Sequence, residues 1–65
     1  MPSSVIRAFN YLPDVARLEI EFLSGRRYVY LGVPADKAAA LQKARSKGRF
    51  FNRHIRDHFP FLRIR

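Results

Sequence analysis

Alternating hydrophobic and polar positions in the first half of the chain predict three β-strands. Residues 5–10 are expected to form a short first strand, and Pro13 with Asp14 marks the loop after it. Residues 17–22 alternate strictly, which is typical of a half-buried strand. Residues 26–31 combine aromatic and branched side chains and are expected to form the third strand. The pattern therefore predicts a small antiparallel three-stranded sheet.

The turn between the second and third predicted strands decides which of their side chains are buried. If Ser24 and Gly25 are its two central residues, Phe22 faces Arg27. The buried face then comprises Leu18, Ile20, Phe22, Val29 and Leu31, whereas Glu19, Glu21, Tyr28 and Tyr30 share the other face. We adopt this two-residue register. A three-residue turn would flip one strand and bury both tyrosines.

An alanine-rich segment after the third strand predicts a first helix. Pro34 suits the first position of a helix, and Asp36 in the first turn suits the helix dipole. Residues 38–44 are strong helix formers, and their small side chains would let the helix lie close to the sheet with Leu41 as its main anchor.

A second helix is expected to follow after a short break. Ser46 is a suitable N-cap for a helix from Arg49 to about His58, which Pro60 would end. Residues 61–65 alternate and could add a short edge strand. We therefore expect an α+β fold in β-β-β-α-α order, with two C-terminal helices packed on one face of the three-stranded sheet.

Size and composition argue against an enzyme. The chain has 65 residues, so we expect a single domain over residues 1–65. A domain this short buries only about 60% of its unfolded surface, which makes a deep, dry cleft difficult to build. It has no cysteine and therefore neither disulfides nor a thiolate zinc site. The polar N-terminus and the lack of an apolar run of about 20 residues favour a cytoplasmic location without a membrane contact.

The positive charge of the chain is the strongest indication of its binding partners. Lysine and arginine number 13 against 5 acidic residues, giving a formal net charge of +8 and a pI of about 11.2. Such a field attracts polyanions, although a general role in solubility is the alternative. Eight of the basic residues lie in the C-terminal third: Lys43, Arg45, Lys47, Arg49, Arg53, Arg56, Arg63 and Arg65.

A helical wheel sorts the second predicted helix into two faces. Phe51, Ile55 and Phe59 recur every four residues and form a core stripe. Arg49, Arg53 and Arg56 fall together on the opposite side. Like charges at this spacing repel one another, and a polyanion would relieve the repulsion and release counterions. The alternative is an ordinary solvated helix face.

These observations define a candidate nucleic-acid-binding site without a cofactor. Its residues are Arg45, Lys47, Arg49, Asn52, Arg53 and Arg56. Phe50 beside them could stack on an unpaired base, or it could pack beneath the tail or the first helix. In the adopted register, Glu19 and Glu21 beside the tyrosines would repel phosphates, so we place the nucleic acid on the helices.

The sequence gives little support for catalytic or metal-binding residues. His54 and His58 have a spacing that can hold a metal on one helix face. However, no third ligand is evident, and Arg53 and Arg56 would repel a cation. The carboxylates form no evident acid–base pair, and the serines lack evident histidine and acid partners. We therefore assign no catalytic residue and no metal ligand.

The order of several motifs resembles a known family. The chain carries Phe22…Gly25…Tyr28-Val29-Tyr30, then Val33-Pro34, and finally the block from Ala44 through Ser46-Lys47-Gly48 to Asn52 and Ile55-Arg56. This arrangement resembles the KTSC domain, named for its occurrence at the C-terminus of some lysyl-tRNA synthetases. The resemblance implies a strand-rich half followed by helices, and it suggests a nucleic-acid role by association. The chain departs from the family near residues 10–12, where a turn would be usual.

Two functions remain as expectations. The first is a non-catalytic nucleic-acid-binding module, for RNA of a tRNA-like kind in preference to DNA. The second is a protein-interaction or assembly module, in which the arginines meet an acidic partner or the domain forms a homodimer through its tyrosine face.

Overall fold

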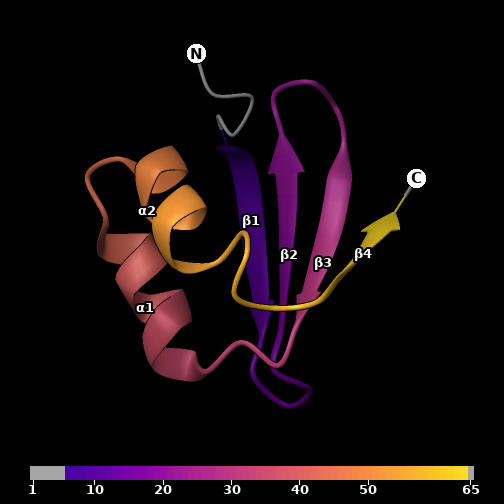
Figure 1. Cartoon of the computed structure of the whole chain (residues 1–65), viewed down its shortest axis with the longest axis vertical. Helices are drawn as coiled ribbons and strands as arrows, with labels where there is room; N and C mark the ends of the chain where they lie inside the picture. The colour runs from indigo at the N-terminus through magenta and orange to yellow at the C-terminus, as the bar shows by residue number, and fades with distance from the viewer. Residues whose placement is uncertain (1–5, 65) are drawn as a thin grey trace.

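The computed structural model describes residues 6–64 as an antiparallel sheet with two helices over one face (Figure 1). The elements in chain order are β1 (Ile6–Leu12), β2 (Arg17–Phe22), β3 (Arg27–Leu31), α1 (Ala35–Lys43), α2 (Lys47–His54) and β4 (Phe61–Ile64). The α+β class and the order of the first five elements are as predicted, and a fourth strand follows the helices. Val5 of the expected first strand and Arg65 of the basic cluster lie outside the described residues.

The sheet has four strands in the order β1-β2-β3-β4, one more than the predicted three. The alternating tail forms β4, which pairs antiparallel with β3 so that Phe61 lies opposite Tyr30. The backbone N–H of Leu31 donates to the Pro60 carbonyl at 2.9 Å, immediately before this pairing begins. The chain therefore passes through both helices before it returns to the edge of its own sheet (Figure 1).

The two-residue register of the β2–β3 hairpin is wrong. Leu18 lies opposite Tyr30 and Ile20 opposite Tyr28, which is the register of a three-residue turn. Phe22 N–H donates to the Arg26 carbonyl at 2.9 Å, and Gly25 inside the turn has φ 92°. A three-residue loop with glycine in the left-handed region is a common hairpin closure. One strand is flipped as a result, and the tyrosines face the helices.

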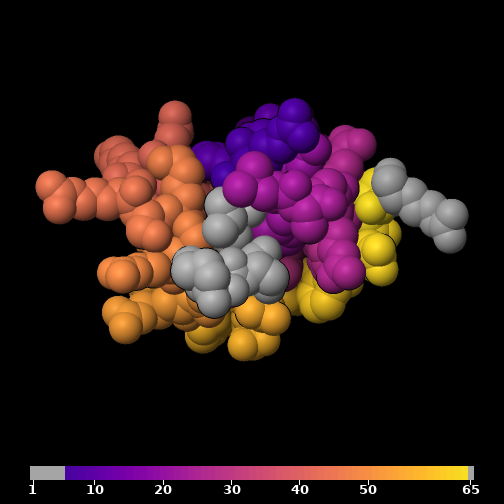
Figure 2. All heavy atoms as spheres, turned by 90° about the horizontal axis from the view of Figure 1, so that it is seen from above, coloured from indigo at the N-terminus to yellow at the C-terminus, as the bar shows by residue number. Residues whose placement is uncertain are grey.

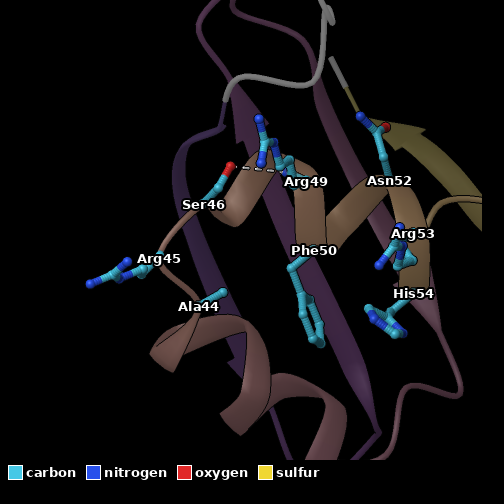
Figure 3. A pocket seen from close by; sticks show the side chains of 8 residues that line it. All are labelled: Ala44, Arg45, Ser46, Arg49, Phe50, Asn52, Arg53 and His54. Carbon is cyan, nitrogen blue, oxygen red and sulfur yellow. Dashed lines mark hydrogen bonds between the residues drawn. The ribbon is translucent and has the colours of Figure 1, made fainter.

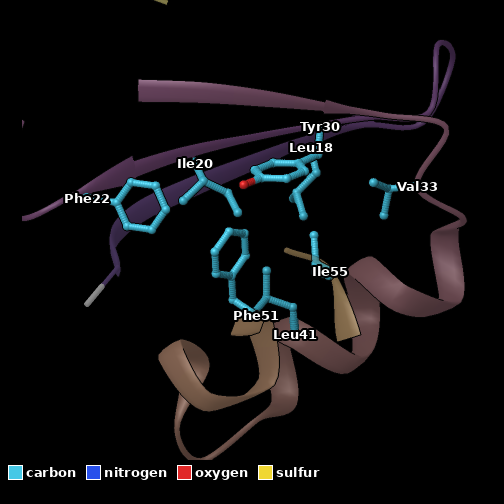
Figure 4. Packing of buried hydrophobic residues seen from close by; sticks show 8 residues of the cluster. All are labelled: Leu18, Ile20, Phe22, Tyr30, Val33, Leu41, Phe51 and Ile55. Carbon is cyan, nitrogen blue, oxygen red and sulfur yellow. The ribbon is translucent and has the colours of Figure 1, made fainter. Parts of the chain in front are cut away.

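The core lies between the sheet and the helices (Figure 4). Its buried members are Leu18, Ile20, Phe22, Tyr30, Val33, Leu41, Phe51 and Ile55. Leu41 and the predicted stripe of Phe51 and Ile55 are confirmed as core residues, and Phe59 is partly buried against them. Tyr30 is only 3% exposed.

Within residues 6–64, no helix lies over the opposite face of the sheet, and we call it the open face (Figure 1). Val29 is buried as predicted, at 8% exposure, but it points to this face, where it pairs with Leu62. Glu19 and Glu21 are also on this side, because they alternate with the buried Leu18 and Ile20. The carboxylates are therefore separated from the tyrosines by the thickness of the sheet.

The region of departure from the family, residues 10–12, continues β1. The Tyr11 hydroxyl donates to the Val33 carbonyl at 2.7 Å and so ties β1 to the segment that leads into α1. The turn after β1 falls at residues 13–16, where Ala16 has φ 52°.

Candidate nucleic-acid interface

Ser46 sets the start of α2, as predicted. Its side-chain oxygen accepts a hydrogen bond from the Arg49 backbone N–H at 3.3 Å (Figure 3). Ser46 itself is extended, with φ −113° and ψ 101°, so the chain turns into the helix directly after it. The helix begins at Lys47, two residues earlier than expected.

Helix α2 ends at His54, before the predicted limit of about His58. The N–H groups of Ile55 and Arg56 both donate to the Phe51 carbonyl, and Ile55 leaves the helical conformation with φ −122°. The chain turns here because it must bring Pro60 to the edge of β3. The wheel geometry therefore does not extend to Arg56, and the predicted stripe of three arginines on one helix is corrected to Arg49 and Arg53.

A cavity of about 660 Å³ lies beside the start of α2 and the α1–α2 turn. We call it the basic cavity; its described lining residues are Ala44, Arg45, Ser46, Arg49, Phe50, Asn52, Arg53 and His54 (Figure 3). Arg45, Arg49 and Arg53 are exposed, and none of the described lining residues is acidic. The cavity thus presents three guanidinium groups from two adjoining elements.

Four of the six predicted site residues line this cavity: Arg45, Arg49, Asn52 and Arg53. Lys47 does not, because its ammonium group turns back and donates to the Ala44 carbonyl at 3.2 Å. Arg56 does not line it either; its Nη1 donates to Asn52 Oδ1 at 3.4 Å, and its side chain borders a different cavity.

Phe50 and His54 form an apolar wall of the basic cavity. Their rings are 4.6 Å apart at 34°, and Phe50 also packs partly against the core. Phe50 is therefore both a packing residue and a cavity residue. Loss of solvent lowers the pKa of His54 below its ordinary 6.5, and the charges of Lys37, Arg53 and His58 lower it further. His54 is thus mainly neutral at pH 7, and the arginines supply the charge.

His58 is engaged elsewhere, since its Nε2 lies 2.9 Å from the Arg53 carbonyl oxygen. Within residues 6–64, no group of three or more histidine, cysteine or acidic side chains could hold a metal ion. In the same described part of the chain, no helix is long and apolar enough to cross a membrane.

A second cavity, of about 420 Å³, was not predicted from the sequence. We call it the aromatic groove; its described lining residues are Phe22, Ser24, Arg26, Tyr28, Phe51, Arg56 and Phe61. The signal for it was Tyr28 in the Tyr-Val-Tyr segment, which lies on the helix side of the sheet in the three-residue register and lines this cavity. Burial raises the pKa of the neighbouring Tyr30, partly offset by the positive charge of Arg56.

The fold and the basic cavity define a small α+β domain with a cationic face, and comparison with known proteins gives its family. The KTSC domain matches residues 2–59. A crystal structure of a KTSC domain protein from Yersinia pestis superimposes with a TM-score of 0.88 at 41% identity, covering 100% of this chain and 92% of that one. The chain therefore belongs to the KTSC domain family.

Relatives of two kinds share this domain. An uncharacterised protein of Stutzerimonas stutzeri is 40% identical over 98% of this chain and 92% of its own length. A lysine–tRNA ligase of Nostoc punctiforme is 43% identical over 94% of this chain, but the match spans 11% of the ligase. A ligase of another Nostoc strain is 38% identical over the same share of both chains.

Proposed function

We propose that this KTSC domain is a nucleic-acid-binding module without catalytic activity, and that its ligand is RNA of a tRNA-like kind in preference to DNA. The observation that carries the proposal is the basic cavity, where Arg45, Arg49 and Arg53 are exposed around one concave surface. Arginine suits this role because its planar fork binds phosphate with two hydrogen bonds.

Phosphate binding would also account for the placement of Arg49 and Arg53, which does not stabilise the isolated fold. Arg49 and Arg53 are four residues apart on α2, so their charges repel across one helical turn. A phosphate backbone in the cavity would offset this repulsion. The preference for RNA rests on the relatives that are lysine–tRNA ligases. The proposal includes a cytoplasmic location, where tRNA is present.

The salt dependence of binding tests the proposal. Fluorescence anisotropy with labelled tRNA and with duplex DNA, at several salt concentrations, gives the slope of log K against log salt. Replacing Arg49 and Arg53 by glutamine should reduce that slope by about 1.8 for a duplex, since each phosphate contact contributes about 0.9. The matched control replaces Arg7 and Arg17 on β1 and β2, which removes the same charge from two residues that do not line the cavity.

The outcomes separate site binding from general attraction. Equal loss of slope in both double variants would refute a localised site. Binding that is absent at low salt, or independent of salt, would refute the function itself. Tighter binding of duplex DNA than of tRNA would overturn the preference for RNA.

A protein-assembly role is the second candidate, on a different surface from the tyrosine face. Tyr30 is only 3% exposed, so we place this role away from the tyrosine face. Leu62, however, is 59% exposed on the open face beside Val29. Light scattering after size exclusion, over a range of protein concentrations, tests the assembly role. A dimer that dissociates in the Leu62→Ser variant supports this role, and a monomer at every concentration rejects it.

A further inference from the structure

The aromatic groove is bordered by a continuous cluster of rings. Tyr28 contacts Phe22 and Phe61 at centroid distances of 5.7 and 5.4 Å, and Phe51 contacts Phe22 at 5.4 Å. Phe22 and Phe51 are buried, whereas Tyr28 is half-buried and Phe61 is 50% exposed. The buried rings therefore form the base of the groove, and the other two leave ring surface accessible.

This surface is open because the helices do not extend over it. Figure 1 shows α1 and α2 on the side of the sheet nearer β1, with β4 at the other edge, and Figure 2 shows the same separation from above. Helix α2 ends at His54, so the chain turns away before it can cover Phe61. Among the described residues, neither helix covers the Phe61 ring, which is 50% exposed on the helix side of the sheet.

Positive charges surround the same groove. Arg26 and Arg56 line it and are exposed. Arg63 lies opposite Tyr28 in the β3–β4 pair, so its side chain projects to the same side of the sheet. Asp57 acts on the Tyr30 hydroxyl but is not among the described lining residues. The groove therefore combines flat apolar surface with a cationic rim.

The groove and the basic cavity adjoin at the end of α2. Asn52 lines the basic cavity, Arg56 lines the groove, and the two side chains are hydrogen-bonded at 3.4 Å. A phosphate chain that runs along Arg49 and Arg53 would thus reach the groove by passing this pair.

We propose that the aromatic groove holds an unpaired base of the RNA strand whose phosphates lie along the basic cavity, an inference that rests on the proposed function. The base stacks on the accessible rings of Phe61 and Tyr28, and Arg26 and Arg56 contact the flanking phosphates. Aromatic rings bind bases without regard to sequence because every base has a flat face. The groove volume of about 420 Å³ falls within the range of about 300–1,000 Å³ typical of small-molecule sites.

A nucleotide fits this groove better than an apolar peptide does. An apolar side chain would use the rings but would leave the guanidinium groups of Arg26 and Arg56 without an anionic partner. A base with its phosphates satisfies both parts of the surface, since arginine and aromatic rings act together in single-strand binding.

Three probes of equal length test the assignment: oligouridylate, an abasic strand that keeps the phosphates, and duplex RNA. Phe61→Leu removes the ring and keeps an apolar side chain. Val15→Ala is the control, at an apolar side chain of similar exposure that lines neither cavity. Phe61→Leu should weaken oligouridylate binding by about fivefold or more, since one stacked base is worth at least about that factor. Binding of the other two probes should not change, and Phe61→Tyr should restore oligouridylate binding.

The controls distinguish this inference from the function on which it rests. Equal weakening of all three probes by Phe61→Leu, or oligouridylate binding no tighter than the abasic strand, would overturn the groove. No effect of Phe61→Leu, with all probes weakened by Arg49→Gln and Arg53→Gln together, would also reject the groove but keep the basic cavity. If no probe binds at low salt, the proposed function fails first.

Discussion

Replacing Phe51 by leucine should lower the free energy of unfolding by roughly 1–3 kcal/mol. Phe51 is buried between α2 and the sheet, where its ring meets Phe22 at 5.4 Å and Tyr30 at 5.2 Å in edge-on geometry. Each such pair is worth about 0.5–1.5 kcal/mol beyond burial, and leucine keeps most of the buried apolar area while it removes both pairs. The loss is thus close to the sum of the two ring contacts.

That loss is large for this chain. A domain of 65 residues has a total stability of roughly 3–10 kcal/mol, at about 0.05–0.15 kcal/mol per residue. With a urea dependence near 1 kcal/mol per molar, at the low end of the range for small proteins, the unfolding midpoint should fall by about 1 M or more. Far-ultraviolet circular dichroism during urea titration measures this shift.

Phe50→Leu is the matched control in the same helix. Phe50 has one ring neighbour, His54, and is only partly buried, so its replacement should cost less than about 1 kcal/mol. Equal midpoints for the two variants, or no shift for Phe51→Leu, would refute the view that the ring contacts of Phe51 stabilise the packing of α2 on the sheet.

Three further outcomes are expected. Ser46→Ala should lower the free energy of unfolding by about 1 kcal/mol, because the Arg49 N–H loses its acceptor. Ser46→Gly should lower it by only about a few tenths of a kcal/mol. Thermal unfolding measures both losses, and equal losses would contradict the role of Ser46 as the cap. Ala16→Gly should stabilise by about 0.5–1 kcal/mol in urea titration, because relief of left-handed strain at φ 52° exceeds the added entropy of the unfolded chain; destabilisation would contradict this. The pKa of His54 is lower in the folded state than its ordinary 6.5, so the unfolded state binds more protons as the pH falls. The contribution of His54 to stability is therefore present above pH 6.5 and is lost as the pH falls through the folded pKa. An NMR titration showing the His54 pKa at or above 6.5 would contradict its partial burial.

Local chemistry in the sequence was sufficient for several elements. Ser46 could be recognised as an N-cap because the capping bond lies within one turn. Phe51 and Ile55 could be placed in the core from helical periodicity, and Leu41 could be placed there from the small side chains around it. The cluster of Arg45, Arg49 and Arg53 also follows from local spacing, which fixes the relative positions of neighbouring side chains.

The errors came from features that depend on the rest of the molecule. Turn length decided the hairpin register, and Ser24-Gly25 is compatible with both a two-residue and a three-residue turn. The choice is made by the core, where the Tyr30 ring packs on Phe51. The same is true of the end of α2, since nothing local to Arg56 indicates that the chain must return to β3. The aromatic groove was missed because it depends on both features.

Strand β4 has a consequence for how the domain folds. The first three strands pair through short turns, but β4 reaches β3 only after both helices lie between them in the chain. Contacts of long sequence separation carry the larger loop-closure entropy, so β4 should dock after the β1–β3 meander has formed. Its docking brings Phe61 beside Tyr28, and the groove therefore exists only in molecules that have completed this last step. Native-state hydrogen exchange should show the β4 amides opening at a lower free energy than those of β2. Ligand binding should reduce this difference in opening free energy.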